Sequence, residues 1–220
     1  MLASDGYRIV ALDRNREGLI HTQQIVAEHG SDALAIEVDV ADSTALRRGI
    51  TDGIVHFGRA DVLVNGAGFV QNRPFLELEE ADWDRMHDVH LKASFTACQA
   101  ILPTMRDAGY GRIVCVASTA ALTGSPNHVH YVSAKAGLIG FVRALAFDVG
   151  QWGVTVNAVI PGAVETPLIA GMYAGRLATV SETPVGRVGQ PEDIAHAIRY
   201  LCSPESGYTS GALLRVSGGL

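Results

Sequence analysis

The sequence predicts an α/β fold built on one doubly wound parallel sheet, with helices packed on both faces in three layers. Short β-branched apolar runs alternate with longer amphipathic segments along the whole chain, which is the pattern of strands joined by crossover helices. Glycine, proline and polar residues gather directly after several of these runs. The 220 residues contain no repeat, low-complexity tract or shift in composition, so we expect a single domain over residues 1–220.

The sequence begins with the end of a predicted helix. Residues 1–6 look like the last turn of a helix closed by a glycine cap. Asp42 or Ser43 is expected to cap a later helix, and a glycine-rich turn follows the third strand. The elements expected here are, in order, a strand at 7–12, a helix at 16–29, a strand at 33–37, a helix ending near residue 57 and a strand at 61–65.

The second half continues the alternation. We expect a long helix at 80–107, a buried strand at 111–117, a helix at 129–151, a strand at 154–160, a helix at 191–201 and a final strand at 212–216. The segment 168–189 carries glycine and proline without clean periodicity. It is therefore expected to form a lid over a substrate.

Composition excludes several classes of protein. Seventeen basic residues stand against 23 acidic ones, for a net charge of −6, and the basic residues are scattered, so we expect no nucleic-acid partner. Cys98, Cys115 and Cys202 lie in apolar runs without metal-ligand spacing, which predicts buried thiols in a reducing compartment and no metal site. No apolar stretch approaches the roughly 20 residues that cross a bilayer, and no signal-peptide pattern is seen. We expect a cytoplasmic protein without a membrane partner.

Tyr131 and Lys135 are the strongest candidates for chemistry. Their spacing of four places them on one face of a helix, and an ammonium group beside a phenol lowers the pKa of the phenol. Ser118 follows a predicted buried strand, at the edge of the sheet where ligands bind in open α/β folds. The alternative is an ordinary surface tyrosine with a solvated lysine one turn further on.

Three other features have both a structural and a functional interpretation. Asp13, at the end of the predicted second strand of a dinucleotide-binding sheet, would accept hydrogen bonds from an adenosine ribose and repel a 2′-phosphate, but it also suits the N-cap of the following helix. The glycines after residue 65 would let the backbone approach a ligand, or simply make a tight turn. His90, alone in a long helix, suits a packed structural histidine as well as a catalyst.

Taken together, the motifs resemble those of the short-chain dehydrogenase/reductase family, which implies a Rossmann-like fold. The resemblance covers nearly the whole chain. It is carried by Asp13, Asp39-Val40, Asn65-Gly66-Ala67-Gly68, Ser118, Tyr131 with Lys135, Pro161-Gly162 with Thr166, and the tail at 186–193.

The resemblance implies a role for each residue. Tyr131 would be the general acid or base, Ser118 would orient the substrate oxygen, and Lys135 would lower the pKa of Tyr131 and hold the nicotinamide ribose. The remaining contacts would go to the cofactor: Asp39 and Val40 to adenine, Asn65, Ala67 and Gly68 near the adenosine ribose, and Pro161, Gly162, Val164 and Thr166 around the carboxamide and a nearby phosphate.

The implied activity is hydride transfer between NAD(H) and a secondary alcohol or ketone. Members similar to 3-oxoacyl-carrier-protein reductases more often use NADP, which Asp13 disfavours. The resemblance also implies a homotetramer or dimer that packs residues 80–107 and the Tyr131 helix against symmetry mates. The alternative function is a catalytically impaired or non-catalytic homologue with a structural or regulatory role.

Two departures from the family pattern motivate that alternative. His90 stands where the family usually has an asparagine that relays protons. The family's first strand and its glycine-rich turn have no counterpart, so we expect a gap in the sheet and a functional chain longer by roughly 25 to 30 residues, most of one βαβ half-unit. The competing expectation is that strands 7–12 and 33–37 dock directly on residues 62–65.

Overall fold

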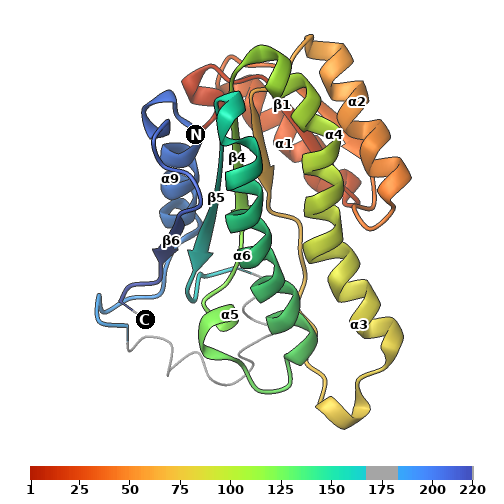
Figure 1. Cartoon of the computed structure of the whole chain (residues 1–220), viewed down its shortest axis with the longest axis vertical. Coiled ribbons are helices and arrows are strands. Elements are labelled where there is room, and N and C mark those ends of the chain that lie inside the picture. Colours follow the sequence, from red (N-terminus) through yellow and green to blue (C-terminus); the bar gives the residue numbers. More distant parts are fainter. Residues whose placement is uncertain (167–182, 220) are drawn as a thin grey trace.

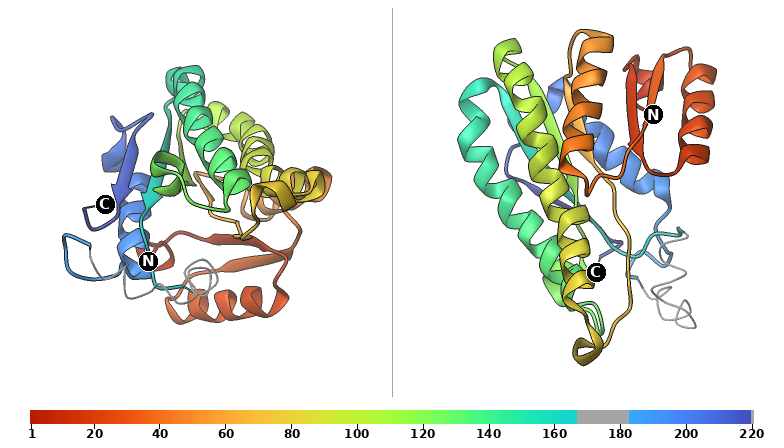
Figure 2. Two further views of the ribbon diagram at one scale, coloured as in Figure 1. Left: turned by 90° about the horizontal axis from the view of Figure 1, so that it is seen from below. Right: turned by 90° about the vertical axis from the view of Figure 1, so that its right-hand side faces the viewer.

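The computed structural model describes residues 1–166 and 183–219. Parallel strands form the middle layer, and helices cover both faces (Figure 1). Helices α2 (Ser43–Phe57), α4 (Ala93–Ala108) and α6 (Val129–Val149) lie on one side. Helices α1 (Arg16–Glu28) and α9 (Pro191–Cys202) lie on the other (Figure 2). The predicted three-layer α/β fold is confirmed.

All strand pairs in the described residues are parallel. The strands are β1 (Ile9–Asp13), β2 (Ala33–Glu37), β3 (Val62–Asn65), β4 (Gly111–Val116), β5 (Val154–Pro161) and β6 (Leu213–Val216). They form two sheets, one of β1 and β2 and one in the order β3-β4-β5-β6. The carboxyl ends of β3, β4 and β5 therefore meet along one edge, where Asn65, Val116 and Pro161 end their strands.

A slot separates the two sheets. Among the described residues, β1 pairs only with β2 and β3 pairs only with β4. A cavity of about 600 Å³ lies between them. Its lining is mainly apolar and includes Ile9, Val10 and Leu12 of β1, Val62, Leu63 and Val64 of β3, and Ile50 and Ile54 of α2. The expected gap in the sheet is thus present, and the expectation that β1 and β2 dock directly on β3 is wrong.

Helix α2 holds β1 in place beside this slot. Gly49 and Gly53 face the strand, and a Cβ at these positions would come within 2.7 Å of Leu12 and 2.9 Å of Val10. The missing side chains let helix and strand approach closely. Asp42 caps α2, because its carboxylate accepts hydrogen bonds from the amides of Thr44 and Ala45.

The long helix expected at 80–107 is interrupted. It consists of α3 (Glu80–His87), a π-helical turn (η3, Asp88–Lys92) and α4. Short π segments inside α-helices occur frequently at functional sites. The turn carries His90, which is buried.

The centre of the larger sheet is rigidly packed. Residues Gly111–Cys115 of β4 and Val154–Ile160 of β5 are buried. The buried Arg112 donates hydrogen bonds to the carbonyl oxygens of Gly111, Gly153, Ser203 and Pro204. This satisfied cation ties the end of α9 to β4. No helix in the described part of the chain is long and apolar enough to span a bilayer.

Candidate active site

Two neighbouring cavities follow the carboxyl edge of the strands. The smaller one, here called the β1–β2 cavity, holds about 70 Å³ and is lined by Asp13, Asp39, Val40, Ala67 and Gly68, among others. The larger one, the β4–β5 cavity, holds about 370 Å³. Its lining includes Gly68, His90, Ser118, Tyr131, Lys135, Pro161, Gly162, Val164 and Thr166. Gly68 borders both cavities, so they meet at that residue.

The β4–β5 cavity brings together the predicted catalytic side chains. Tyr131 and Lys135 come from α6 and are 6% and 5% exposed. The Lys135 Nζ lies 5.9 Å from the centre of the Tyr131 ring and donates a 2.6 Å hydrogen bond to the carbonyl oxygen of Val116. Burial lowers the pKa of Lys135 to about 8. Ser118 follows β4, and its hydroxyl oxygen accepts a hydrogen bond from the amide of Ala120 at 3.2 Å.

His90 also borders this cavity and is 3% exposed. Its Nε2 lies 2.9 Å from the carbonyl oxygen of Phe69 and 3.2 Å from the amide nitrogen. We assign the proton to Nε2, which donates to the closer carbonyl. The opposite tautomer would bury an N–H at Nδ1, which has no partner among the described residues. Burial, and then the nearby Lys135, lower the pKa of His90 to about 3. His90 is therefore neutral, and its unprotonated Nδ1 is buried.

The His90 ring explains one glycine of the turn after β3. A Cβ at Gly68 would lie 2.5 Å from Cε1 of His90, whereas one at Gly66 would meet only Val116 at 3.9 Å. The absence of a side chain at Gly68 thus leaves room for the ring of His90. The ring of His90 also meets the Tyr131 ring edge to face, with centres 5.4 Å apart.

The β1–β2 cavity places the two predicted adenosine contacts side by side. Asp13 is exposed, and its Oδ1 accepts a hydrogen bond from the amide of Asn15 at 2.8 Å. The N-cap of α1 is Asn15, whose side chain accepts from Gly18, so the alternative role of Asp13 as that cap is wrong. Asp39 is bound through one oxygen by Arg85 at 2.8 Å and through the other by the amide of Ala41 at 3.0 Å.

Asn65 turns away from the β1–β2 cavity. Its amide nitrogen lies 3.5 Å from the sulfur of Cys115 and 3.8 Å from that of Cys98, and the residue lines a separate inner cavity of about 80 Å³. The Asn65 side chain therefore does not line the β1–β2 cavity, and a contact between this residue and a ribose stays a prediction for its backbone. The three cysteines are free and buried, as the sequence predicts.

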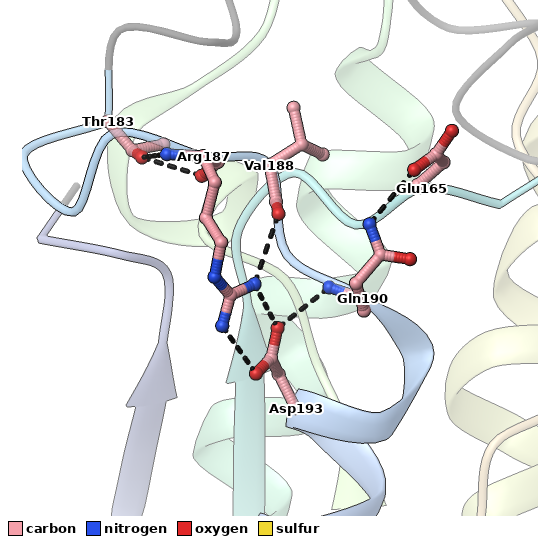
Figure 3. Close-up of polar contacts among 6 residues, drawn as sticks. All are labelled: Glu165, Thr183, Arg187, Val188, Gln190 and Asp193. Atoms are coloured by element: carbon pink, nitrogen blue, oxygen red, sulfur yellow. Dashed lines mark hydrogen bonds and ion pairs between the residues drawn. The ribbon is translucent and has the colours of Figure 1, made fainter.

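The far wall of the β4–β5 cavity is fixed by contacts at the base of the predicted lid (Figure 3). Val164 forms a parallel bridge with Gly189, and the Gln190 side chain donates to Glu165 at 2.9 Å. Arg187 holds Asp193 through two hydrogen bonds of 2.6 and 2.8 Å. This network joins residues 183–193 to the segment after β5. Residues 168–182 of the predicted lid lie outside the described residues.

Some participants were not identified from the sequence. Arg85 binds the carboxylate of Asp39, and the carbonyl oxygen of Phe69 binds the ring of His90. In each pair the two residues are remote in the sequence. The sequence does not predict the π turn, because no residue in 88–92 breaks the helical pattern. In residues 1–166 and 183–219, no group of three or more histidine, cysteine, aspartate or glutamate side chains is placed to hold a metal ion.

Comparison with known proteins agrees with this geometry. The family profile described as enoyl-(acyl carrier protein) reductase matches residues 1–220. A short-chain reductase protein, NovJ, from Streptomyces niveus is 37% identical, over 99% of this chain and 86% of its own. The acetoacetyl-CoA reductase of Cupriavidus necator is 37% identical, over 100% and 90%. The 3-oxoacyl-[acyl-carrier-protein] reductase FabG of Vibrio cholerae is 33% identical, over 100% and 89%.

A solved structure has the same fold. The crystal structure of a putative short-chain alcohol dehydrogenase from Sinorhizobium meliloti superposes with a TM-score of 0.94 at 33% identity, covering 99% of this chain and 87% of the other.

Proposed function

Since the chain belongs to the short-chain dehydrogenase/reductase family of oxidoreductases, we propose that it transfers hydride between NAD(H) and a secondary alcohol or ketone, with Tyr131 as the general acid or base. The observation that carries this proposal is the convergence of Ser118, Tyr131, Lys135 and His90 on one cavity of about 370 Å³. A small molecule with one reactive oxygen suits this arrangement, because Lys135 is the only one of the four side chains that carries a charge at pH 7.

The residues present fit the adenosine and nicotinamide ends of a dinucleotide. Carboxylates line the β1–β2 cavity, and Lys135 lines the β4–β5 cavity, which begins at the shared Gly68. Asp13, Asp39 and Val40 would hold the adenosine end. Lys135, Pro161, Gly162, Val164 and Thr166 would hold the nicotinamide end, and Asn65 and Ala67 would contribute backbone near the ribose. The bound cofactor supplies the hydride acceptor or donor.

The protein's own groups manage the proton. Ser118 would donate a hydrogen bond to the substrate oxygen and fix it beside the phenol. Tyr131 would give or take the proton of that oxygen, and the ammonium of Lys135 would favour the phenolate. His90 would keep its neutral ring against the ring of Tyr131 and would not carry the proton as imidazolium, because its Nδ1 is buried.

Preference for NAD(H) over NADP(H) rests on Asp13, whose exposed carboxylate lies at the end of β1 in the β1–β2 cavity. A 2′-phosphate there would meet a like charge. Arg14 lines the same cavity and would attract that phosphate. The test is the ratio of kcat/KM for the two cofactors, in the native protein and in Asp13→Asn. Equal or better turnover of the native protein with NADPH overturns this part of the proposal.

The general acid or base is tested with Tyr131→Phe, which keeps the ring and removes the hydroxyl. Turnover is expected to fall by about a hundredfold or more while NADH affinity is nearly unchanged. Tyr208→Phe is the matched control, because Tyr208 is fully exposed and far along the chain. Wild-type turnover in Tyr131→Phe would assign the proton to another group.

The non-catalytic alternative is tested in the same assays. A native protein that binds no NADH by nicotinamide fluorescence, and reduces neither a 3-oxoacyl nor a 2-enoyl thioester, would favour a structural or regulatory role. Turnover of the enoyl compound alone would move the proposed chemistry from a ketone to a carbon–carbon double bond.

Helix α6 supports a homo-oligomer. Its sequence is apolar around most of its circumference, and its outward stripe of Ala136, Gly140, Ala144 and Phe147 is exposed, Phe147 by 90%. A helix that is apolar on every side is normally covered. We propose a dimer or tetramer packed through this stripe and located in the cytoplasm, where the three thiols stay reduced. Light scattering of Phe147→Glu should show a smaller assembly than the native protein.

A further inference from the structure

Asp39 is the more tightly held of the two carboxylates that line the β1–β2 cavity, because Asp13 accepts a hydrogen bond at one oxygen and Asp39 at both. Its Oδ2 accepts the 2.8 Å hydrogen bond from Nη2 of Arg85, and its Oδ1 accepts the 3.0 Å hydrogen bond from the amide of Ala41. The bond from Arg85 is the main reason that the pKa of Asp39 lies below its usual range. A carboxylate held at both oxygens has one orientation, and each oxygen keeps a second lone pair for a ligand.

Arg85 reaches Asp39 from a different part of the chain. It comes from α3, whereas Asp39 follows β2, and both side chains line the β1–β2 cavity. The side chains of Arg85 and Asp39 are 36% and 42% exposed. An ion pair so open to water contributes little to the stability of the fold, so stability does not explain why the two side chains are paired. Their position on the wall of a ligand cavity indicates a role in binding.

We propose that Arg85 is a positioning residue for the cofactor: it fixes the Asp39 carboxylate in the orientation that receives the adenosine end. This inference rests on the proposed nucleotide-binding function. Without the guanidinium, the carboxylate would rotate among staggered rotamers and toward water, and binding would have to restrict it again. The side chain of Arg85 acts through Asp39 and not on the reacting atoms, which lie in the other cavity.

The test compares Arg85→Met, Arg85→Lys, Asp39→Asn and the Arg85→Met/Asp39→Asn double variant. Affinity for NADH is measured by fluorescence and for ADP-ribose by calorimetry, and kcat is measured at saturating NADH. We expect Arg85→Met to weaken both ligands on the order of tenfold, as loss of a partly exposed charged hydrogen bond predicts, with kcat kept. Arg85→Lys should recover part of the affinity, because a lysine supplies the charge without the planar fork.

The double variant separates positioning from a direct contact. If Arg85 acts through Asp39, it should bind ADP-ribose no more weakly than the weaker single variant. Arg73→Met is the matched control, since Arg73 pairs with Asp82 at 3.5 Å and does not line the β1–β2 cavity. Unchanged affinity in Arg85→Met, or additive losses in the double variant, would overturn the inference. A native protein that binds neither ligand overturns the proposed function, and this inference with it.

Discussion

The ammonium of Lys135 donates a 2.6 Å hydrogen bond to the carbonyl oxygen of Val116, the last residue of β4. This bond anchors a buried cation at the strand edge, and its neighbour Tyr131 lines the same cavity. Burial brings the pKa of Lys135 to about 8, so the lysine is charged below that pH and loses its proton above it.

Reduction should therefore slow in mild base. As pH rises through about 8, Lys135 becomes neutral and no longer stabilises the phenolate of Tyr131, so kcat/KM for ketone reduction should fall. The measurement is a pH profile of kcat/KM, with Lys135→Arg beside it. A guanidinium stays charged in this range, so the variant, slower throughout, should lack the decline near pH 8. If kcat/KM declined at the same pH in both proteins, the decline would belong to a group other than Lys135.

His90 should make the fold sensitive to acid. Its pKa is about 3 when folded against an ordinary 6.5, so between these values only the unfolded chain binds the proton. The free energy of unfolding should then decrease as pH falls below 6.5, by about 1.4 kcal/mol for each pH unit from this group at most. Urea unfolding of native protein and His90→Asn at pH 7 and 5 tests this.

In His90→Asn the loss between pH 7 and 5 should be smaller, because an amide does not titrate in this range, and turnover should be kept, because the buried neutral ring carries no proton. His21→Asn serves as the control, since His21 is exposed on α1. Equal acid sensitivity in His90→Asn and the native protein would contradict the assignment.

The two glycines after β3 should respond differently to alanine. A Cβ at Gly68 would overlap the His90 ring at 2.5 Å, whereas one at Gly66 has only an ordinary contact at 3.9 Å. Gly68→Ala should lower the melting temperature by several degrees, for about 1 to 3 kcal/mol of overpacking, and Gly66→Ala should change it little. The Gly68→Ala/His90→Ala double variant should recover part of the loss if the ring is the cause.

The sequence predicts those features of the site that depend on residues close together in the chain. The cap at Asp42 and the spacing of Tyr131 and Lys135 depend on residues within one helical turn, and all of these predictions are confirmed by the structure. The ion pair of Arg85 with Asp39 joins residues 46 positions apart, and the turn of Asn65 toward two thiols depends on how α4 packs on β4. Such contacts exist only after the elements have assembled.

The interrupted helix has a similar explanation. Residues 80–107 keep apolar positions compatible with one continuous helix. In the structure a π turn interrupts this helix, and its residue His90 contacts Phe69 and Tyr131. The apolar period alone does not show where such a turn lies.

A strand that fills the slot between β1 and β3 should stabilise the protein strongly. Both facing edges lack strand partners within the described residues, and each orphaned backbone group costs about 1 to 3 kcal/mol. A form carrying a further parallel strand ahead of Met1 should melt about 10 °C higher and bind NADH more tightly. Calorimetry and fluorescence titration of the two forms make the comparison. Equal melting temperatures and affinities would show that the slot needs no strand.

The division of the sheet also has a consequence for how a bound molecule acts on the fold. Asp13 and Asp39 belong to the β1–β2 sheet and its following loop, whereas Ser118, Tyr131 and Lys135 depend on β4 and α6. A dinucleotide that contacts both groups would link two sheets that share no strand pairing among the described residues. Its binding energy adds directly to the cohesion between them. Hydrogen exchange of the β1 and β2 amides reports local unfolding of that sheet. The rate of this exchange should then decrease as the nucleotide concentration rises, while the exchange rate in β5 stays the same.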